Sequence, residues 1–227
     1  MNRIRVVVTL IAAVAGLLCA TTSHAAKSYL SGGYLTGGFP MGDWGKIAGF
    51  GLGLDEATVV RAAPDKPFSI RGSLGIHYNF SRTVDVPKDN IGVNDKLQLE
   101  TKNWSAFFGI GPEIGPAHGD MRPFLFGTVG FDTYWTSSNL SGTAGGLPFS
   151  QPHGDSRLGF AWSGGVGLRR QVSTGVLGEL SVEYRSGSGH KFLLPDQITT
   201  SGTTVNASRD ERATDQLIVR LGTVFGM

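Results

Sequence analysis

Cysteine is almost absent from this sequence. The single cysteine, Cys19, lies in an apolar N-terminal segment, after Leu17 and Leu18. A lipoprotein signal places a small residue before its cysteine, so we expect no lipid anchor here. Without this segment the chain would hold no cysteine at all. That excludes a disulfide framework, a thiolate metal site and a cysteine nucleophile.

The N-terminal segment has the three parts of a secretory signal peptide. Two arginines come first, residues 6–20 are almost free of polar side chains, and Ser23 and Ala25 supply the small residues of a cleavage site. An uncleaved membrane anchor is the alternative, but it needs roughly 20 apolar residues, and this run is shorter. We therefore predict that residues 1–25 are removed and that residues 26–227 form one domain.

Net charge is also lacking. Loss of Arg3 and Arg5 with the signal peptide leaves 18 basic side chains against 18 acidic ones. A nucleic-acid-binding protein would show an excess of basic residues. We therefore expect no nucleic acid partner. No motif in the sequence implies a cofactor or a metal, and we expect neither.

Helical periodicity is missing after residue 26, and 34 glycines are too many for helix interiors. Instead, apolar and polar residues alternate with the period of a β-strand, most clearly in 68–81. One face there carries Phe68, Ile70, Gly72, Leu74, Ile76, Tyr78 and Phe80. The pattern predicts eight strands, with ten as the alternative count. The expected strands are 28–37, 46–58, 68–81, 98–111, 122–136, 158–170, 176–186 and 216–227.

The connections between these strands alternate in length. Short connections are expected at 64–67, 115–121 and 172–175, whereas 84–96, 137–157 and 190–212 are long and polar. Membrane barrels have short periplasmic turns and long external loops. The sequence therefore predicts an all-β fold, a closed antiparallel up-and-down transmembrane β-barrel.

A soluble barrel with its apolar face inward is the alternative fold. The polar faces argue against it, because they consist mainly of glycine, serine and alanine with few charges, which suits a narrow interior. The apolar faces also carry aromatic residues near strand ends, as the interfacial rings of a membrane barrel do. The expected ring residues are Tyr78, Phe80, Trp104, Tyr134, Trp135, Trp162 and Tyr184.

The C-terminal residues resemble the β-signal of outer-membrane barrels. Arg220, Gly222 and Phe225 fit a polar residue, a glycine and alternating hydrophobic residues, whereas Met227 replaces the usual terminal aromatic residue. With the signal peptide and the strands, the chain resembles the small outer-membrane β-barrel superfamily of OmpA-like and OmpX-like domains. The resemblance implies a bacterial outer-membrane location, contact with membrane lipid and insertion by the barrel-assembly machinery.

Several charged residues fall on the predicted inner faces of the strands. Because buried charges persist only when paired, we expect them to form an interior network. Its expected members are Arg71, His77, Arg169, Glu179, Glu183, Arg185 and Arg220. His77 is a candidate acid or base, but no catalytic motif accompanies it, and a hydrogen-bonded structural role is favoured.

Three functions are compatible with this sequence. The favoured hypothesis is a non-enzymatic barrel with a plugged lumen, because eight strands enclose only enough space for side chains. Such a barrel would act in envelope integrity or in surface interaction through long external loops. A small-solute channel or ligand-binding barrel is the alternative, and a lipid A-modifying enzyme is the third. The apolar run 192–195 marks either a partner surface or packing onto the barrel rim.

Overall fold

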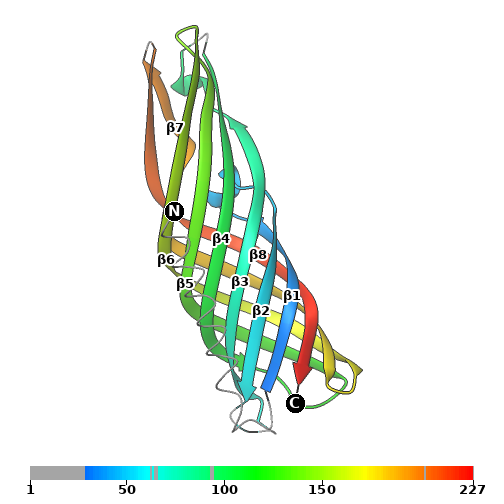
Figure 1. Ribbon diagram of the computed structural model, residues 1–227. Helices are drawn as coiled ribbons and strands as arrows, with labels where there is room; N and C mark the ends of the chain where they lie inside the picture. Colours follow the sequence, from blue (N-terminus) through cyan, green and yellow to red (C-terminus); the bar gives the residue numbers. More distant parts are fainter. Residues whose placement is uncertain (1–28, 62, 64–65, 93–94, 202, 227) are drawn as a thin grey trace, which may run out of the picture.

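The alternating residues form eight antiparallel strands that close into a barrel, with β8 paired back to β1 (Figure 1). This confirms the predicted all-β, up-and-down fold and its strand number. The computed structural model describes residues 29–61, 63, 66–92, 95–201 and 203–226. The predicted signal peptide lies outside these residues, and its cleavage stays a prediction.

The elements follow one another in simple order along the chain. They are β1 Tyr29–Pro40, α2 Trp44–Ile47, β2 Gly51–Arg61, β3 Phe68–Asp85, η2 Lys88–Asn90, β4 Lys96–Ile114, β5 Met121–Ala144, β6 Leu147–Ser173, β7 Val176–Ser201 and β8 Thr204–Gly226. Among the described residues, no helix is both long enough and apolar enough to cross a membrane.

The outer face of the barrel is apolar, as predicted. Leu54, Ile76, Val129, Val166 and Leu221 come from five different strands, and each leaves between 45% and 63% of its surface exposed. Side chains at neighbouring strand positions point into the barrel and are mostly small or polar. A sheet of this polarity suits hydrocarbon outside and a filled polar interior.

Aromatic side chains gather on the outer face where the strands leave the apolar band. The ring centroids of Tyr78 and Trp104 lie 4.8 Å apart, and those of Trp162 and Tyr184 lie 5.5 Å apart. The prediction that Tyr134 belongs to this ring is wrong, because Tyr134 is only 4% exposed. It precedes Trp135 directly, and adjacent residues of a strand point to opposite faces.

The predicted long loops are largely wrong, because β5 to β8 continue through them. These strands have 24, 27, 26 and 23 residues and form two hairpins that project beyond one end of the barrel (Figure 1). The β5–β6 hairpin closes at Gly145 and Gly146, whose φ angles of +57° and +76° suit a tight two-residue turn. We call this projecting part of the molecule the extension.

The second predicted strand also begins later than expected. Residues 44–47 form the short helix α2, and β2 starts only at Gly51. Trp44 of α2 is fully buried, and its ring packs on Tyr134 and Phe192 at centroid distances of 5.2 and 4.6 Å. Burial of one large ring thus fixes a helical turn where alternation alone suggested a strand.

The barrel wall divides where the extension begins. β6 and β7 pair from Ala161 and Gly187 down to Ser173 and Val176, beside the short turn that joins the two strands. Beyond that point β7 carries a register shift at 187–190 relative to β8, where Gly189 adopts a φ of +80°. The β7–β8 hairpin therefore leaves β6 and faces the β3–β6 sheet across an apolar core.

This extension core contains a dozen buried residues. They are Trp44, Ile47, Ala48, Val86, Leu97, Leu99, Tyr134, Leu140, Phe192, Leu193, Leu194 and Ile198. The apolar run 192–195 is thus packed inside the molecule, and Phe192, Leu193 and Leu194 are at most 3% exposed. Of the two interpretations of that run, the structure supports packing and not an exposed partner surface.

Candidate functional site in the barrel interior

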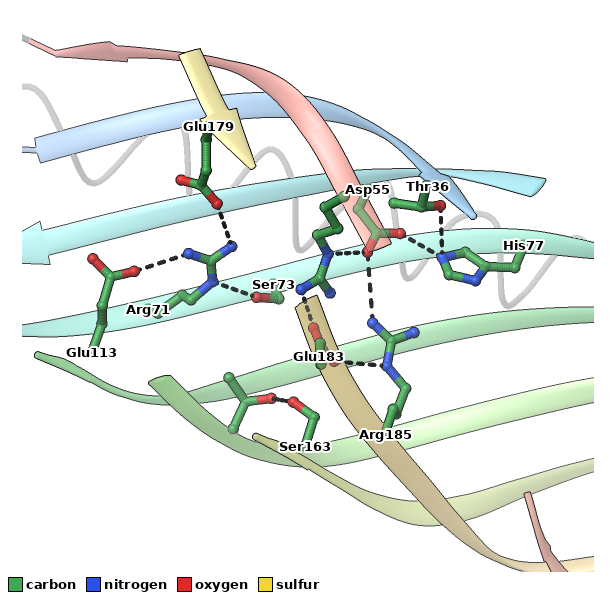
Figure 2. A network of polar contacts seen from close by, with 12 residues as sticks. Thr36, Asp55, Arg71, Ser73, His77, Glu113, Ser163, Glu179, Glu183 and Arg185 are labelled. Carbon is green, nitrogen blue, oxygen red and sulfur yellow. Dashed lines mark hydrogen bonds and ion pairs between the residues drawn. The ribbon is translucent and has the colours of Figure 1, made fainter. Parts of the chain in front are cut away.

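Four charged side chains meet in the half of the barrel that is nearer the short turns. Arg169 of β6 donates to Glu113 of β4 at 2.6 and 2.8 Å and to Glu179 of β7 at 2.7 Å. Arg71 of β3 lies 2.9 Å from Glu113 and 3.4 Å from Glu179 (Figure 2). All four side chains are at most 2% exposed. We call these residues the lower network.

Aromatic rings fill the space around the lower network. The guanidinium of Arg169 lies 4.1 Å from the ring centroid of Phe124, and that of Arg71 lies 4.5 Å from Phe126. These rings occupy space that the glycines of β6 leave free. A Cβ at Gly167 would lie 2.3 Å from the ring of Phe124. The two arginines balance the two glutamates, so the lower network is neutral. The rings of Phe124 and Phe126 pack against its guanidinium groups.

A second cluster, the upper network, lies further towards the extension. Asp55 of β2 accepts from Arg220 of β8 at 2.7 Å and lies 3.6 Å from Arg185 of β7. Arg185 also pairs with Glu183 at 3.1 Å, and Glu183 contacts Arg220 (Figure 2). His77 completes the cluster, with its Nε2 2.7 Å from Asp55. Two arginines again face two carboxylates.

His77 is held in place by two partners and is 1% exposed. Its Nε2 lies 2.7 Å from Asp55 and 3.1 Å from the hydroxyl of Thr36 (Figure 2). Arg185 and Arg220 both contact Asp55, so the carboxylate beside the imidazole is shared among three cationic or polar groups. Burial among these partners separates the imidazole of His77 from solvent.

A third pair lies at the entrance to the extension. His190 Nε2 is 2.8 Å from Asp132, and the hydroxyl of Thr214 donates to the other carboxylate oxygen at 3.4 Å. The ring of Tyr134 packs edge-on against His190 at 4.6 Å. His190 sits directly after the bulge in β7, which turns its side chain into the interior. The sequence predicts His190 in a connection, because the alternation that marks β7 is clear only up to residue 186.

The seven predicted interior residues all point inward, but the structure divides them between two networks. Arg71, Arg169 and Glu179 lie in the lower one, and the other four lie in the upper one. Asp55 and Glu113, each of which joins two arginines, are not among the predicted residues. Asp55 is followed by Glu56, and alternation does not tell which of them points inward. Glu113 lies beyond the predicted end of its strand.

The residues of the predicted assembly signal take different positions. Arg220 lies in the upper network, and Phe225 is 56% exposed on the outer face. Gly222 faces inward, where a Cβ would lie 2.7 Å from the ring of Tyr34. Met227 lies outside the described residues. Recognition by the assembly machinery stays a prediction.

The described residues contain no cluster of three or more histidine, cysteine, aspartate or glutamate side chains arranged to hold a metal ion. The carboxylates of the two networks are instead paired with arginine. These ion pairs link several strands across the barrel interior.

No protein-family model and no curated protein sequence matches this chain significantly. Solved structures do match. The outer membrane protein OprG from Pseudomonas aeruginosa is 15% identical, with 90% of this chain and 97% of that chain covered and a TM-score of 0.50. A major outer membrane protein from Thermus thermophilus is 13% identical, with 90% and 100% covered and a TM-score of 0.49. The outer membrane protease OmpT from Escherichia coli is 8% identical, with 89% and 98% covered and a TM-score of 0.41.

These identities are too low to transfer an activity, and the likeness concerns the fold. The polarity of this fold is typical of membrane barrels, because its eight antiparallel strands close with an apolar face outward and ion pairs inward. The chain therefore has the fold of the small outer-membrane β-barrels, which OprG shares.

Proposed function

We propose that this protein is a non-enzymatic outer-membrane barrel with a plugged lumen, which acts in envelope integrity or surface interaction through its extension. The observation that carries the proposal is the pair of neutral arginine–carboxylate networks. Each network joins strands that are not neighbours in the sheet, from β3 to β7 in the lower one and from β2 to β7 in the upper one.

Apolar clusters at both ends of the lumen support a plug. Leu30, Tyr34, Ala57, Val59, Leu177 and Val224 form a buried cluster near the short turns. The extension core closes the other end. An ion that crossed the barrel would have to separate paired charges and pass between packed apolar side chains, and both steps are unfavourable.

Conductance in a planar bilayer tests the plug. The wild-type protein is expected to give no stable channel. A variant in which Arg71, Glu113, Arg169 and Glu179 are all replaced by serine removes the lower network while keeping the interior neutral, and it is expected to increase conductance. The matched control is Arg170→Ser, an exposed position beside Arg169. A stable wild-type channel would overturn the plugged lumen and favour the solute-channel alternative.

The buried geometry of the Asp132–His190 pair supports a non-enzymatic role. Nucleophilic catalysis needs a hydroxyl within reach of the histidine. The Thr214 hydroxyl bonds to Asp132 instead, and His190 is only 1% exposed. Mass spectrometry of lipid A from cells with and without the gene tests this point. Identical lipid A profiles are expected, and an acyl chain gained or lost would favour the enzyme.

The two biological roles differ in their need for the tip of the extension. A variant that replaces residues 141–150 with Asn-Gly keeps the core residue Leu140 and shortens the β5–β6 hairpin. If the protein maintains the envelope, this variant should restore dye exclusion in a deletion strain as well as the wild type does. If it binds a surface partner, the shortened protein should insert normally but lose adhesion. Normal adhesion and dye exclusion in the deletion strain itself would contradict both roles.

A further inference from the structure

The outer part of the β7–β8 hairpin is not paired with either neighbouring strand. Pairing of β6 with β7 ends at Gly187, and pairing of β1 with β8 ends at Gln216. Beyond these points the described residues of β7 and β8 form ladder pairs only with each other. We call residues 190–201 of β7 and 204–212 of β8 the flap. The flap is therefore joined to the barrel through its own two strands and not through a continuous sheet.

The base of the flap is a break in the ladder between β7 and β8. The register shifts between Gly187 and His190, and Gly189 within this break has a φ of +80°. A bulge leaves its extra residue without a ladder partner and bends the strand. Glycine adds backbone freedom at the same point, because it has no Cβ. The break therefore has the properties of a hinge.

The sides of the flap are held by exposed ion pairs. Arg209 lies 3.8 Å from Asp155 of β6, and Glu211 lies 3.9 Å from Arg157 of the same strand. These four side chains are at least 28% exposed. A third pair joins Arg212 to the N-cap residue of α2 at 3.7 Å. Ion pairs in water contribute little stability, so the sides of the flap are only weakly held.

The free end of the flap is held by a buried carboxylate from the connection between β3 and β4. Asp95 is 7% exposed and accepts a hydrogen bond from the hydroxyl of Thr200 of β7 at 2.9 Å. Its other oxygen accepts the backbone N–H of Gly145, in the β5–β6 turn, at 2.8 Å. The Thr200 hydroxyl in turn accepts the N–H of Gly92 at 2.8 Å. We call Asp95 and Thr200 the latch, because they tie the flap to two other segments.

We propose that the flap is hinged at residues 187–190 and that the latch keeps it closed over the extension core. Opening brings Phe192, Leu193 and Leu194 out of that core into water, so the open state is the minor one. The barrel keeps its own ladders and ion pairs, so the flap opens while the barrel stays closed. The latch thus sets how often the chain exposes an apolar surface at this end. This device lies in the extension and does not depend on a plugged lumen.

Thiol labelling measures the opening, because the chain has a single cysteine, which Cys19→Ala removes. In that background Ala48→Cys places one thiol in the extension core, and Ala57→Cys places one in the apolar cluster near the short turns. Both alanines are at most 3% exposed, and each substitution adds a single sulfur atom. With the protein in vesicles, a maleimide is expected to label Ala48→Cys faster than Ala57→Cys.

Removal of the latch should accelerate labelling of the extension core alone. Asp95→Ala is expected to raise the rate at Ala48→Cys about tenfold, equivalent to about 1.4 kcal/mol, because hydrogen bonds to a carboxylate are lost. Thr200→Val removes only the hydroxyl of the flap and should also raise this rate, whereas Thr200→Ser should keep it. Labelling at Ala57→Cys should not change in any of these variants.

Asp85→Ala is the matched control, because it removes a carboxylate that accepts from Gln98 at 2.9 Å within the β3–β4 pair. It is expected to leave the rate at Ala48→Cys unchanged. Heat-modifiable migration in gels reports that each variant forms a closed barrel, and Thr200→Val decides the question if Asp95→Ala does not fold. An unchanged rate without the latch would overturn the proposal. Equal acceleration at both thiols would also overturn it, because flap and barrel would then open as one unit.

Discussion

The membrane-spanning barrel and the extension have opposite polarity, although the same strands build both. Along β4 the inward positions change from Leu97 and Leu99 in the extension to Glu113 near the other end. The outward positions change from Glu100 to Ile110 over the same strand. In lipid the polar residues pack inside, whereas in water the apolar residues do. The solvent outside the wall, and not the strand geometry, decides which face is buried.

The two regions are therefore held together by different interactions. In the barrel, paired charges satisfy one another inside a wall that hydrocarbon surrounds. In the extension, apolar side chains leave water and pack around Trp44. A substitution of the same kind should therefore change the free energy of unfolding very differently in the two regions. Comparing such substitutions separates the contribution of the ion pairs from that of the apolar core.

The largest effect is expected from removing one charge of the lower network. Arg169→Ala leaves Glu113 and Glu179 short of a partner inside the barrel, which should lower the free energy of unfolding by about 3–5 kcal/mol. Urea unfolding in vesicles measures this change. Arg170→Ala, at the adjacent exposed position, is expected to change it little. Equal losses for both variants would show that the network does not stabilise the barrel.

A loss of about 3 kcal/mol is expected when the extension core loses its central ring. Trp44→Ala removes contacts with Tyr134 and Phe192 and leaves a cavity. Because the barrel below has its own interactions, hydrogen exchange should accelerate in the β7–β8 hairpin but not near Arg169. Uniform acceleration along the chain would mean that the two regions unfold as one unit.

A charge on the outer face should distinguish lipid from water. Val129→Lys places an ammonium in the apolar band and should cost about 2 kcal/mol in vesicles. Ser150→Lys places the same group on the exposed outer surface of the extension, where water solvates it. Its unfolding midpoint should match that of the wild type. A comparable loss at Ser150 would argue that the extension is also covered by lipid.

The smallest effect is expected at the surface of α2. Lys46 lies 2.6 Å from Asp43 and holds the pKa of that carboxyl below its usual value. Any stability from this pair is present above the pKa of Asp43 in the unfolded chain and is lost as the pH falls through the lower folded value. Because both groups are solvated, Asp43→Asn should leave the pH dependence of unfolding unchanged within error. A clear change would indicate that α2 controls the extension core.

The sequence by itself determined the fold class and the inward orientation of the seven predicted interior residues, and it favoured eight strands over ten, because alternation depends only on neighbouring residues. It did not determine the partners Asp55 and Glu113, the lengths of β5 to β8 or the burial of Tyr134. Those features depend on which strands face each other across the closed barrel and on where lipid gives way to water. Only the tertiary structure sets these distances, because residues 108 positions apart, such as Arg71 and Glu179, meet only once the barrel is closed.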